Sequence, residues 1–143
     1  DEFQIVHLCG KGKMDNLLLN TPGYKQFEYI KEELKDLFAM ADVVISRAGA
    51  NAICELLALK KPNILIPLPA ASSRGDQLLN AKSFEAQGFS VVLDEDDLTT
   101  DLLVQEVKKL YESRQTYVEA MTGSGQMDSI RTIMSLIEEC AGK

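Results

Sequence analysis

The segment between Ser46 and Glu55 holds the residues whose types and spacing best fit a chemical role. Its turn is built from three small residues, Ala48, Gly49 and Ala50, which let a ligand approach the backbone closely. A helix that begins at this turn directs its free N–H groups and the positive end of its dipole toward the same space. We therefore expect the turn to bind an anion, and a diphosphate is a natural candidate.

The acid that follows this turn suggests which anion it is. Glu55 comes four residues after Asn51, so the two share one face of the predicted helix. A carboxylate close to an anion site is unfavourable unless it accepts hydrogen bonds, and the two hydroxyls of a ribose can supply them. A plainer interpretation also fits, in which Gly49 makes a tight turn and Glu55 is a favourable acid in the first helical turn. Both interpretations stand on the pattern alone.

A second polar segment, residues 72–77, precedes another predicted helix. Gln77 and Asn80 are three residues apart on that helix, so their amide groups share a face. Amides both donate and accept hydrogen bonds, which is what recognition of neutral sugar hydroxyls requires. The alternative is that this segment is only a helix start, with Asp76 as its N-cap.

These segments are positioned by short apolar runs that alternate with helical patterns, as in a parallel sheet. The pattern predicts an α/β fold of Rossmann-like type, a parallel sheet with helices on both faces. In such sheets ligands bind beyond the carboxyl ends of the strands, which is where both polar segments lie. The predicted strands are residues 3–9, 27–30, 43–46, 63–67 and 90–93. The predicted helices are residues 30–41, 51–59 and 76–87, the last closed by Gly88, and two apolar stripes at 102–110 and 127–137 separated by 123–125.

Composition narrows the classes of function. The chain has 143 residues, which predicts one domain, and a net charge of −7, which argues against nucleic acid as a partner. Its three cysteines, Cys9, Cys54 and Cys140, are far apart and odd in number, so we predict no zinc site, no disulfide framework and a reducing compartment. No apolar run approaches the roughly 18 residues that cross a bilayer. The chain lacks an initiator Met, so we expect it to be a piece of a longer protein.

The order of these motifs resembles a known family. Residues 41–89, ADVVISRAGANAICELLALKKPNILIPLPAASSRGDQLLNAKSFEAQGF, are similar to the C-terminal domain of the MurG family, glycosyltransferase family 28. Residues 7–12 (HLCGKG) and 27–30 (FEYI) fit the same domain, so the resemblance covers nearly the whole chain. The family has two Rossmann-like domains facing a cleft, the GT-B architecture. The resemblance implies that this chain is its C-terminal, UDP-N-acetylglucosamine-binding half.

The resemblance also implies roles for the first group of residues. Ile30 matches a position whose backbone contacts uracil, and Glu55 matches the acid that holds the ribose hydroxyls. Gly49 and Ala50 match the turn whose amides face the phosphates and the sugar. These roles agree with those expected from the residue types.

For Gln77, Asn80 and Arg47 the resemblance implies roles of differing detail. Gln77 matches the glutamine that reads the sugar hydroxyls, Asn80 lies just beyond it, and Arg47 belongs to the motif with its role open. The chain departs from some members in having Asp76 where they have a second glutamine, and Ala48 where they have serine. The resemblance therefore implies one sugar-reading glutamine and no hydroxyl contact at position 48.

For the intact protein the resemblance implies transfer of N-acetylglucosamine from UDP-N-acetylglucosamine to lipid I, with inversion, giving lipid II for peptidoglycan. It implies a location on the cytoplasmic side of the bacterial membrane, held peripherally, and no metal or other cofactor is predicted. The family's first strand of this domain, its Gly-Gly-Ser loop and helix, and the N-terminal acceptor domain have no counterpart in residues 1–143. We therefore expect no catalytic residue here, no turnover by this chain alone, and a possible homodimer through exposed sheet edges. Two alternatives stay open: a non-catalytic binding subunit of a two-chain transferase, and a related glycolipid synthase.

Overall fold

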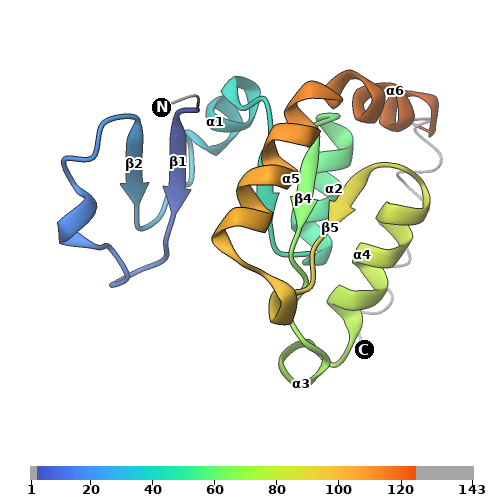
Figure 1. Cartoon of the computed structure of the whole chain (residues 1–143), viewed down its shortest axis with the longest axis horizontal. Coiled ribbons are helices and arrows are strands. Elements are labelled where there is room, and N and C mark those ends of the chain that lie inside the picture. The colour runs from blue at the N-terminus through green and yellow to red at the C-terminus, as the bar shows by residue number, and fades with distance from the viewer. Residues whose placement is uncertain (1–2, 125–143) are drawn as a thin grey trace. The chain divides into compact units, whose positions relative to one another are not determined.

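The computed structural model describes residues 3–124 and divides the chain into two compact units, residues 1–39 and 40–143 (Figure 1). The first unit contains a two-stranded parallel sheet of β1 (Ile5–Leu8) and β2 (Tyr24–Phe27). A single 3₁₀ turn, η1 (Asn16–Leu18), lies between these strands, and α1 (Leu34–Met40) follows them. Each unit is described separately below.

The second strand begins and ends three residues earlier than predicted. The prediction of residues 27–30 followed the apolar pattern, whereas β2 contains Lys25 and Gln26. Gln26 is nevertheless buried, because its amide group pairs with the backbone of Asp15: Nε2 donates to the Asp15 oxygen and Oε1 accepts from the Asp15 N–H, both at 2.9 Å. A polar residue that satisfies its hydrogen bonds can occupy a strand interior, and periodicity cannot detect it. The predicted helix over 30–41 likewise begins only at Leu34.

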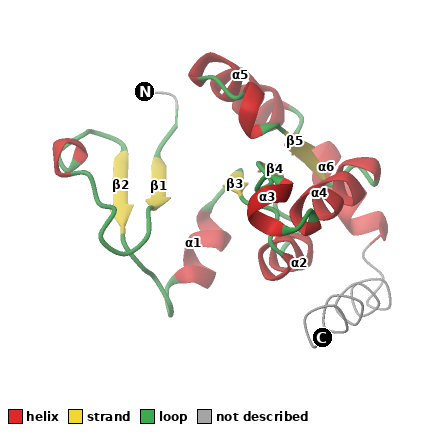
Figure 2. Cartoon of the chain, turned by 90° about the horizontal axis from the view of Figure 1, so that it is seen from below, coloured by secondary structure: helices red, strands yellow, loops and turns green. Residues whose placement is uncertain are grey.

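The second unit is a three-stranded parallel sheet of order β3-β4-β5 with helices on both faces. Seen along the sheet, α5 covers one face, and α2 and α4 cover the other (Figure 2). The Rossmann-like α/β prediction is therefore confirmed for this unit. Its elements are β3 (Val44–Ser46), α2 (Ala50–Ala58), β4 (Asn63–Leu65), α3 (Ala70–Ser73), α4 (Asp76–Ala86), β5 (Ser90–Val92), η2 (Glu95–Asp97), α5 (Thr100–Glu112) and α6 (Arg114–Ser124).

The described strands form two parallel sheets, whereas the sequence pattern predicted one. One sheet belongs to each unit, β1-β2 to the first and β3-β4-β5 to the second.

Apolar packing fixes α5 against the sheet. Ile64 of β4, Leu93 and Leu110 are buried together, and the stripe predicted from residues 102–110 packs on them. The other end of β4 holds a buried polar pair, in which Ser90 Oγ donates to Asn63 Oδ1 at 2.6 Å and Asn63 Nδ2 donates to the Lys61 backbone oxygen at 2.8 Å. Because both polar side chains have partners, they tie β4 to β5 without an unsatisfied group.

Helix ends agree with the sequence in part. Gly88 closes α4 as predicted: its φ is +78°, and the N–H of Phe89 reaches back to the oxygen of Phe84 at 3.0 Å. Two helices were not anticipated, namely α3 inside the segment taken as a loop and α6 over 114–124. The stripe predicted at 127–137, and with it Cys140, lies outside the described residues.

No helix within residues 3–124 combines the length and the apolar character that a membrane span requires.

Candidate functional site

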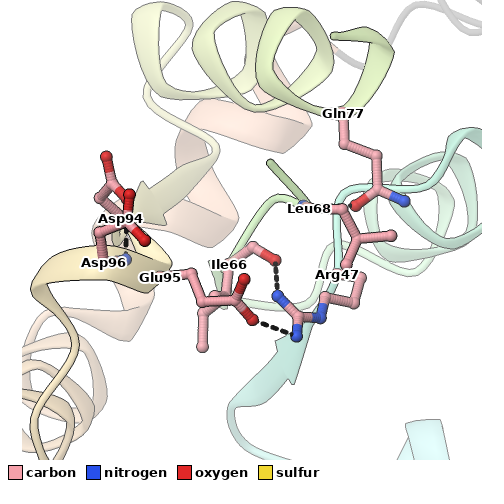
Figure 3. A network of polar contacts seen from close by, with 7 residues as sticks. All are labelled: Arg47, Ile66, Leu68, Gln77, Asp94, Glu95 and Asp96. Carbon is pink, nitrogen blue, oxygen red and sulfur yellow. Dashed lines mark hydrogen bonds and ion pairs between the residues drawn. The ribbon is translucent and has the colours of Figure 1, made fainter. Parts of the chain in front are cut away.

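The carboxyl ends of β3, β4 and β5 lie at one edge of the sheet because the three strands are parallel. The side chain of Arg47, the first residue after β3, crosses this edge (Figure 3). Its Nη1 donates to the backbone oxygen of Ile66, just beyond β4, at 3.2 Å. Its Nη2 forms an ion pair of 2.6 Å with Oε1 of Glu95, in the turn that follows β5. One arginine therefore links the segments that follow all three strands.

The turn at Gly49 leads directly into α2 and leaves the start of that helix open. Gly49 is the N-cap residue, no side chain caps the helix, and its first turn contains no acid. The φ of Gly49 is −67°, a value that any residue adopts, so the backbone turn does not require glycine. Gly49 still makes the turn into α2, but the turn needs no left-handed conformation. What remains is the absence of a side chain beside uncapped N–H groups, which is the arrangement that an anion site needs.

Gln77 brings the start of α4 against this turn. A Cβ atom added to Gly49 would lie 3.9 Å from Gln77 Nε2. The other end of the same amide is fixed, because Oε1 accepts a hydrogen bond of 2.9 Å from the N–H of Leu68. Gln77 is therefore held with its donor end at the Gly49 turn.

The start of α4 differs from the plainer interpretation of its sequence. Its N-cap residue is Gly75, in a left-handed conformation with φ +85°, and Asp76 is already the first helical residue. The reading of Asp76 as an N-cap is therefore wrong. No side chain caps α4, so two open helix starts lie at the same edge of the sheet.

Asn80 was predicted to recognise the sugar, but its side chain binds the protein backbone. Its Nδ2 donates to the backbone oxygen of Ala48 at 3.0 Å, and Ala48 is fully buried. Asn80 thus holds the backbone of the turn one residue before Gly49. At least this donor of the Asn80 amide is committed to the protein, which shifts its role toward positioning the turn.

Glu55 lies in the second turn of α2 and is exposed. The interpretation of Glu55 as a favourable first-turn acid is therefore wrong, because the first turn contains none. Its neighbour Cys54 is partly buried, and this burial raises the pKa of the Cys54 thiol. Glu55 belongs to the same helix whose start follows the turn.

Ile30 belongs to the first unit and is partly exposed, whereas Arg47, Gly49, Glu55 and Gln77 belong to the second. The site is therefore described from the residues of the second unit.

Glu95 was missed by sequence reasoning. It is one of four consecutive acids, residues 94–97, that follow the fifth strand. The first three of them shape a compact turn, in which Asp94 Oδ1 accepts from the N–H of Asp96 at 3.0 Å. The available signal was its place after a strand, at the same edge as Arg47. Among residues 3–124, no three His, Cys, Asp or Glu side chains are grouped as a metal site.

The geometry defines a class of site. Two open helix starts favour negative charge, a fixed amide beside them offers a hydrogen-bond donor, and a carboxylate one turn further accepts hydrogen bonds. The domain is a parallel α/β domain of Rossmann type, a class in which ligands bind at the carboxyl edge of the sheet.

Comparison with known proteins gives the family. Residues 1–137 match the glycosyltransferase family 28 C-terminal domain, and this chain belongs to that family. It is 62% identical over 138 residues to the UDP-N-acetylglucosamine–N-acetylmuramyl-(pentapeptide) pyrophosphoryl-undecaprenol N-acetylglucosamine transferase of Lachnospira eligens. It is 54% identical over 140 residues to the transferase of that name from Geobacillus thermodenitrificans.

These matches cover most of this chain and a smaller share of each relative. The chain is covered to 96% and 98%, but it spans only 39% of the length of either transferase. The crystal structure of Acinetobacter baumannii MurG superposes with a TM-score of 0.71 at 25% identity, covering 96% of this chain and 41% of that one. The GT-B C-terminal fold implied by the resemblance is therefore confirmed.

Proposed function

We propose that this chain is the donor-binding part of a UDP-N-acetylglucosamine transferase of the MurG type. The observation that carries the proposal is that the fixed amide of Gln77 lies close to the open start of α2. Its Nε2 is 3.9 Å from the position that a Cβ atom would occupy on Gly49. We assign the diphosphate to this open helix start and the sugar to the amide beside it. The transferases of Lachnospira eligens and Geobacillus thermodenitrificans, whose names specify N-acetylglucosamine transfer, support the assignment.

Each residue at this edge then has a proposed part. The N–H groups at Gly49 and Ala50 bind the diphosphate, and Glu55 accepts hydrogen bonds from the two ribose hydroxyls. Gln77 Nε2 reads a sugar hydroxyl, since its Oε1 is already occupied by Leu68. For Ile30, which belongs to the first unit, the resemblance implies a backbone contact to uracil.

The intact enzyme would transfer the sugar in one displacement. A hydroxyl of the lipid-linked acceptor attacks the anomeric carbon, the bond from that carbon to the β-phosphate oxygen breaks, and UDP leaves with inversion. The negative charge that develops on UDP lies at the start of α2, where preorganised N–H groups stabilise it. The base that takes the acceptor proton and the lipid site belong to a further domain, and the whole protein acts peripherally at the cytoplasmic membrane face.

The lengths of the relatives favour this assignment over a separate binding subunit. Each is a single chain of which this chain spans about two fifths. A donor domain and an acceptor domain in one polypeptide account for that difference in length.

A binding experiment tests the proposal at the level of ligand class. We expect calorimetric titration of the chain with UDP to give a one-to-one isotherm, and titration with ADP or inorganic diphosphate to give much weaker binding. ADP keeps the diphosphate and the ribose, so its comparison isolates the base. Equal binding of UDP and inorganic diphosphate would show a general anion site and contradict the assignment. Sugar transfer to a lipid acceptor by this chain alone would contradict the proposed need for a further domain.

A further inference from the structure

We propose that Glu95 is a positioning residue for donor binding, acting through its ion pair with Arg47. The inference rests on the proposed function and adds a residue to it. Glu95 itself need not touch the ligand, because its effect passes through the backbone on either side of Arg47.

A continuous series of contacts leads from Glu95 to the turn. Arg47 is bound at once to Glu95 and to the backbone oxygen of Ile66, and it lies only two residues before Gly49. Two residues beyond Ile66, the N–H of Leu68 holds the amide of Gln77. Arg47 thus contacts both segments that carry the proposed ligand contacts. These are the turn after β3, which leads to Gly49, and the residues that follow β4, which hold Gln77 (Figure 3).

Glu95 can act as an anchor because its own backbone is held. It begins η2, whose N–H groups return to the preceding residues: Asp97 donates to the oxygen of Asp94 at 3.2 Å, and Leu98 donates to the oxygen of Glu95 at 3.3 Å. Leu98 in turn packs against the core under α5. The carboxylate that holds Arg47 is therefore mounted on a turn fixed to the sheet.

Charge gives a second reason for the pair. Residues 94–97 place four carboxylates near an edge that is proposed to bind a diphosphate, and like charges oppose each other. The guanidinium of Arg47 offsets one of these charges at close range. Both side chains are partly exposed, 46% for Arg47 and 37% for Glu95, so the pair by itself contributes little to folding. Its effect should therefore be seen in ligand affinity rather than in stability.

The test compares two truncations within one acidic turn. Glu95→Ala removes the partner of Arg47, whereas Asp97→Ala removes an equal charge from the same turn without touching Arg47. Calorimetry with UDP-N-acetylglucosamine should show binding about three- to tenfold weaker for Glu95→Ala, and unchanged or tighter for Asp97→Ala, which relieves repulsion. Glu95→Gln keeps an acceptor for the guanidinium and should recover part of the loss.

Two further measurements separate positioning from simple damage. The melting temperatures of Glu95→Ala and Asp97→Ala should agree, and Glu95→Ala added to Arg47→Ala should cause no further loss of affinity. The proposal is overturned if the unsubstituted chain binds the nucleotide sugar while Glu95→Ala and Asp97→Ala bind it alike. If the unsubstituted chain does not bind it, the proposed function fails and the role of Glu95 fails with it.

Discussion

The side-chain nitrogen of Gln77 lies 3.9 Å from the position that a Cβ atom would occupy on Gly49, so the starts of α2 and α4 face each other at close range. Neither helix start is capped by a side chain. Natural helix starts are usually satisfied by a cap, by water or by a ligand. The proposed site, two open starts beside one fixed amide, would therefore be organised before a ligand binds.

Gly49→Ala should separate binding from folding. The φ of −67° accepts alanine and the new methyl group meets only an ordinary contact at 3.9 Å, so we expect the free energy of unfolding to change by less than about 1 kcal/mol. The same methyl group takes room beside the N–H groups, so affinity for UDP should fall by roughly tenfold. Thermal melts and calorimetry on the same samples measure both quantities.

Gly88→Ala is the matched control for that substitution. Gly88 has a φ of +78° at the end of α4, a conformation in which a side chain is strained. Its replacement should cost stability, about 1 kcal/mol or more, and leave UDP affinity unchanged. A Gly49→Ala protein that loses stability but keeps its affinity for UDP would show that the glycine serves the fold.

Glu55→Ala should remove the preference for ribose. Because Glu55 is exposed, the melting temperature should not change, whereas a lost hydrogen bond to a charged acceptor weakens UDP binding by about 1.5–3 kcal/mol. The unsubstituted chain should bind UDP more tightly than 2′-deoxy-UDP, and the variant should bind the two alike. Glu85→Ala removes an equal charge from α4 and should keep the discrimination. A Glu55→Ala protein that still prefers UDP would remove the ribose assignment.

The contrast between Glu55 and Asn80 shows how far the sequence could predict this site. The end of β3, the small-residue turn and the helix with Glu55 follow from periodicity and residue size, and the structure places these close to their predicted bounds. The hydrogen bond from Asn80 to Ala48 and the ion pair from Arg47 to Glu95 join residues 32 and 48 positions apart. Such partners depend on how separate elements pack, and a pattern read along the chain carries no information about them. The buried Gln26 in β2 escaped prediction for the same reason.

Asn80→Ala should act on stability first. It leaves the buried oxygen of Ala48 without this donor, which costs about 1–3 kcal/mol of unfolding free energy. Chemical denaturation of Asn80→Ala should therefore have a lower midpoint than that of the unsubstituted chain. Lys82→Ala, at an exposed position of the same helix, should leave the midpoint unchanged. If Asn80→Ala keeps full stability and loses affinity for the nucleotide sugar, the side chain reads the ligand rather than bracing the turn.

The pH dependence of Cys54 alkylation should report the burial of this residue in α2. Burial raises the pKa of its thiol, so at a given pH less thiolate is present in the folded protein than in the unfolded protein. The thiolate is the reactive form, so alkylation by iodoacetamide should be slower when the protein is folded, and its pH profile should shift to higher pH. The measurement uses a Cys9→Ser/Cys140→Ser chain with and without denaturant. A folded-state profile at or below the unfolded one would contradict the burial of Cys54.

The central claim is that the edge formed by Gly49, Glu55 and Gln77 binds UDP-N-acetylglucosamine as a nucleotide sugar. The most direct measurement is calorimetric titration with UDP-N-acetylglucosamine and with UDP-N-acetylgalactosamine, which differ only in the orientation of one sugar hydroxyl. We expect tighter binding of UDP-N-acetylglucosamine by roughly tenfold, in line with one hydrogen bond to the sugar, and loss of that difference in Gln77→Ala. Equal affinity for the two sugars in the unsubstituted chain, or no binding of either, would contradict the account.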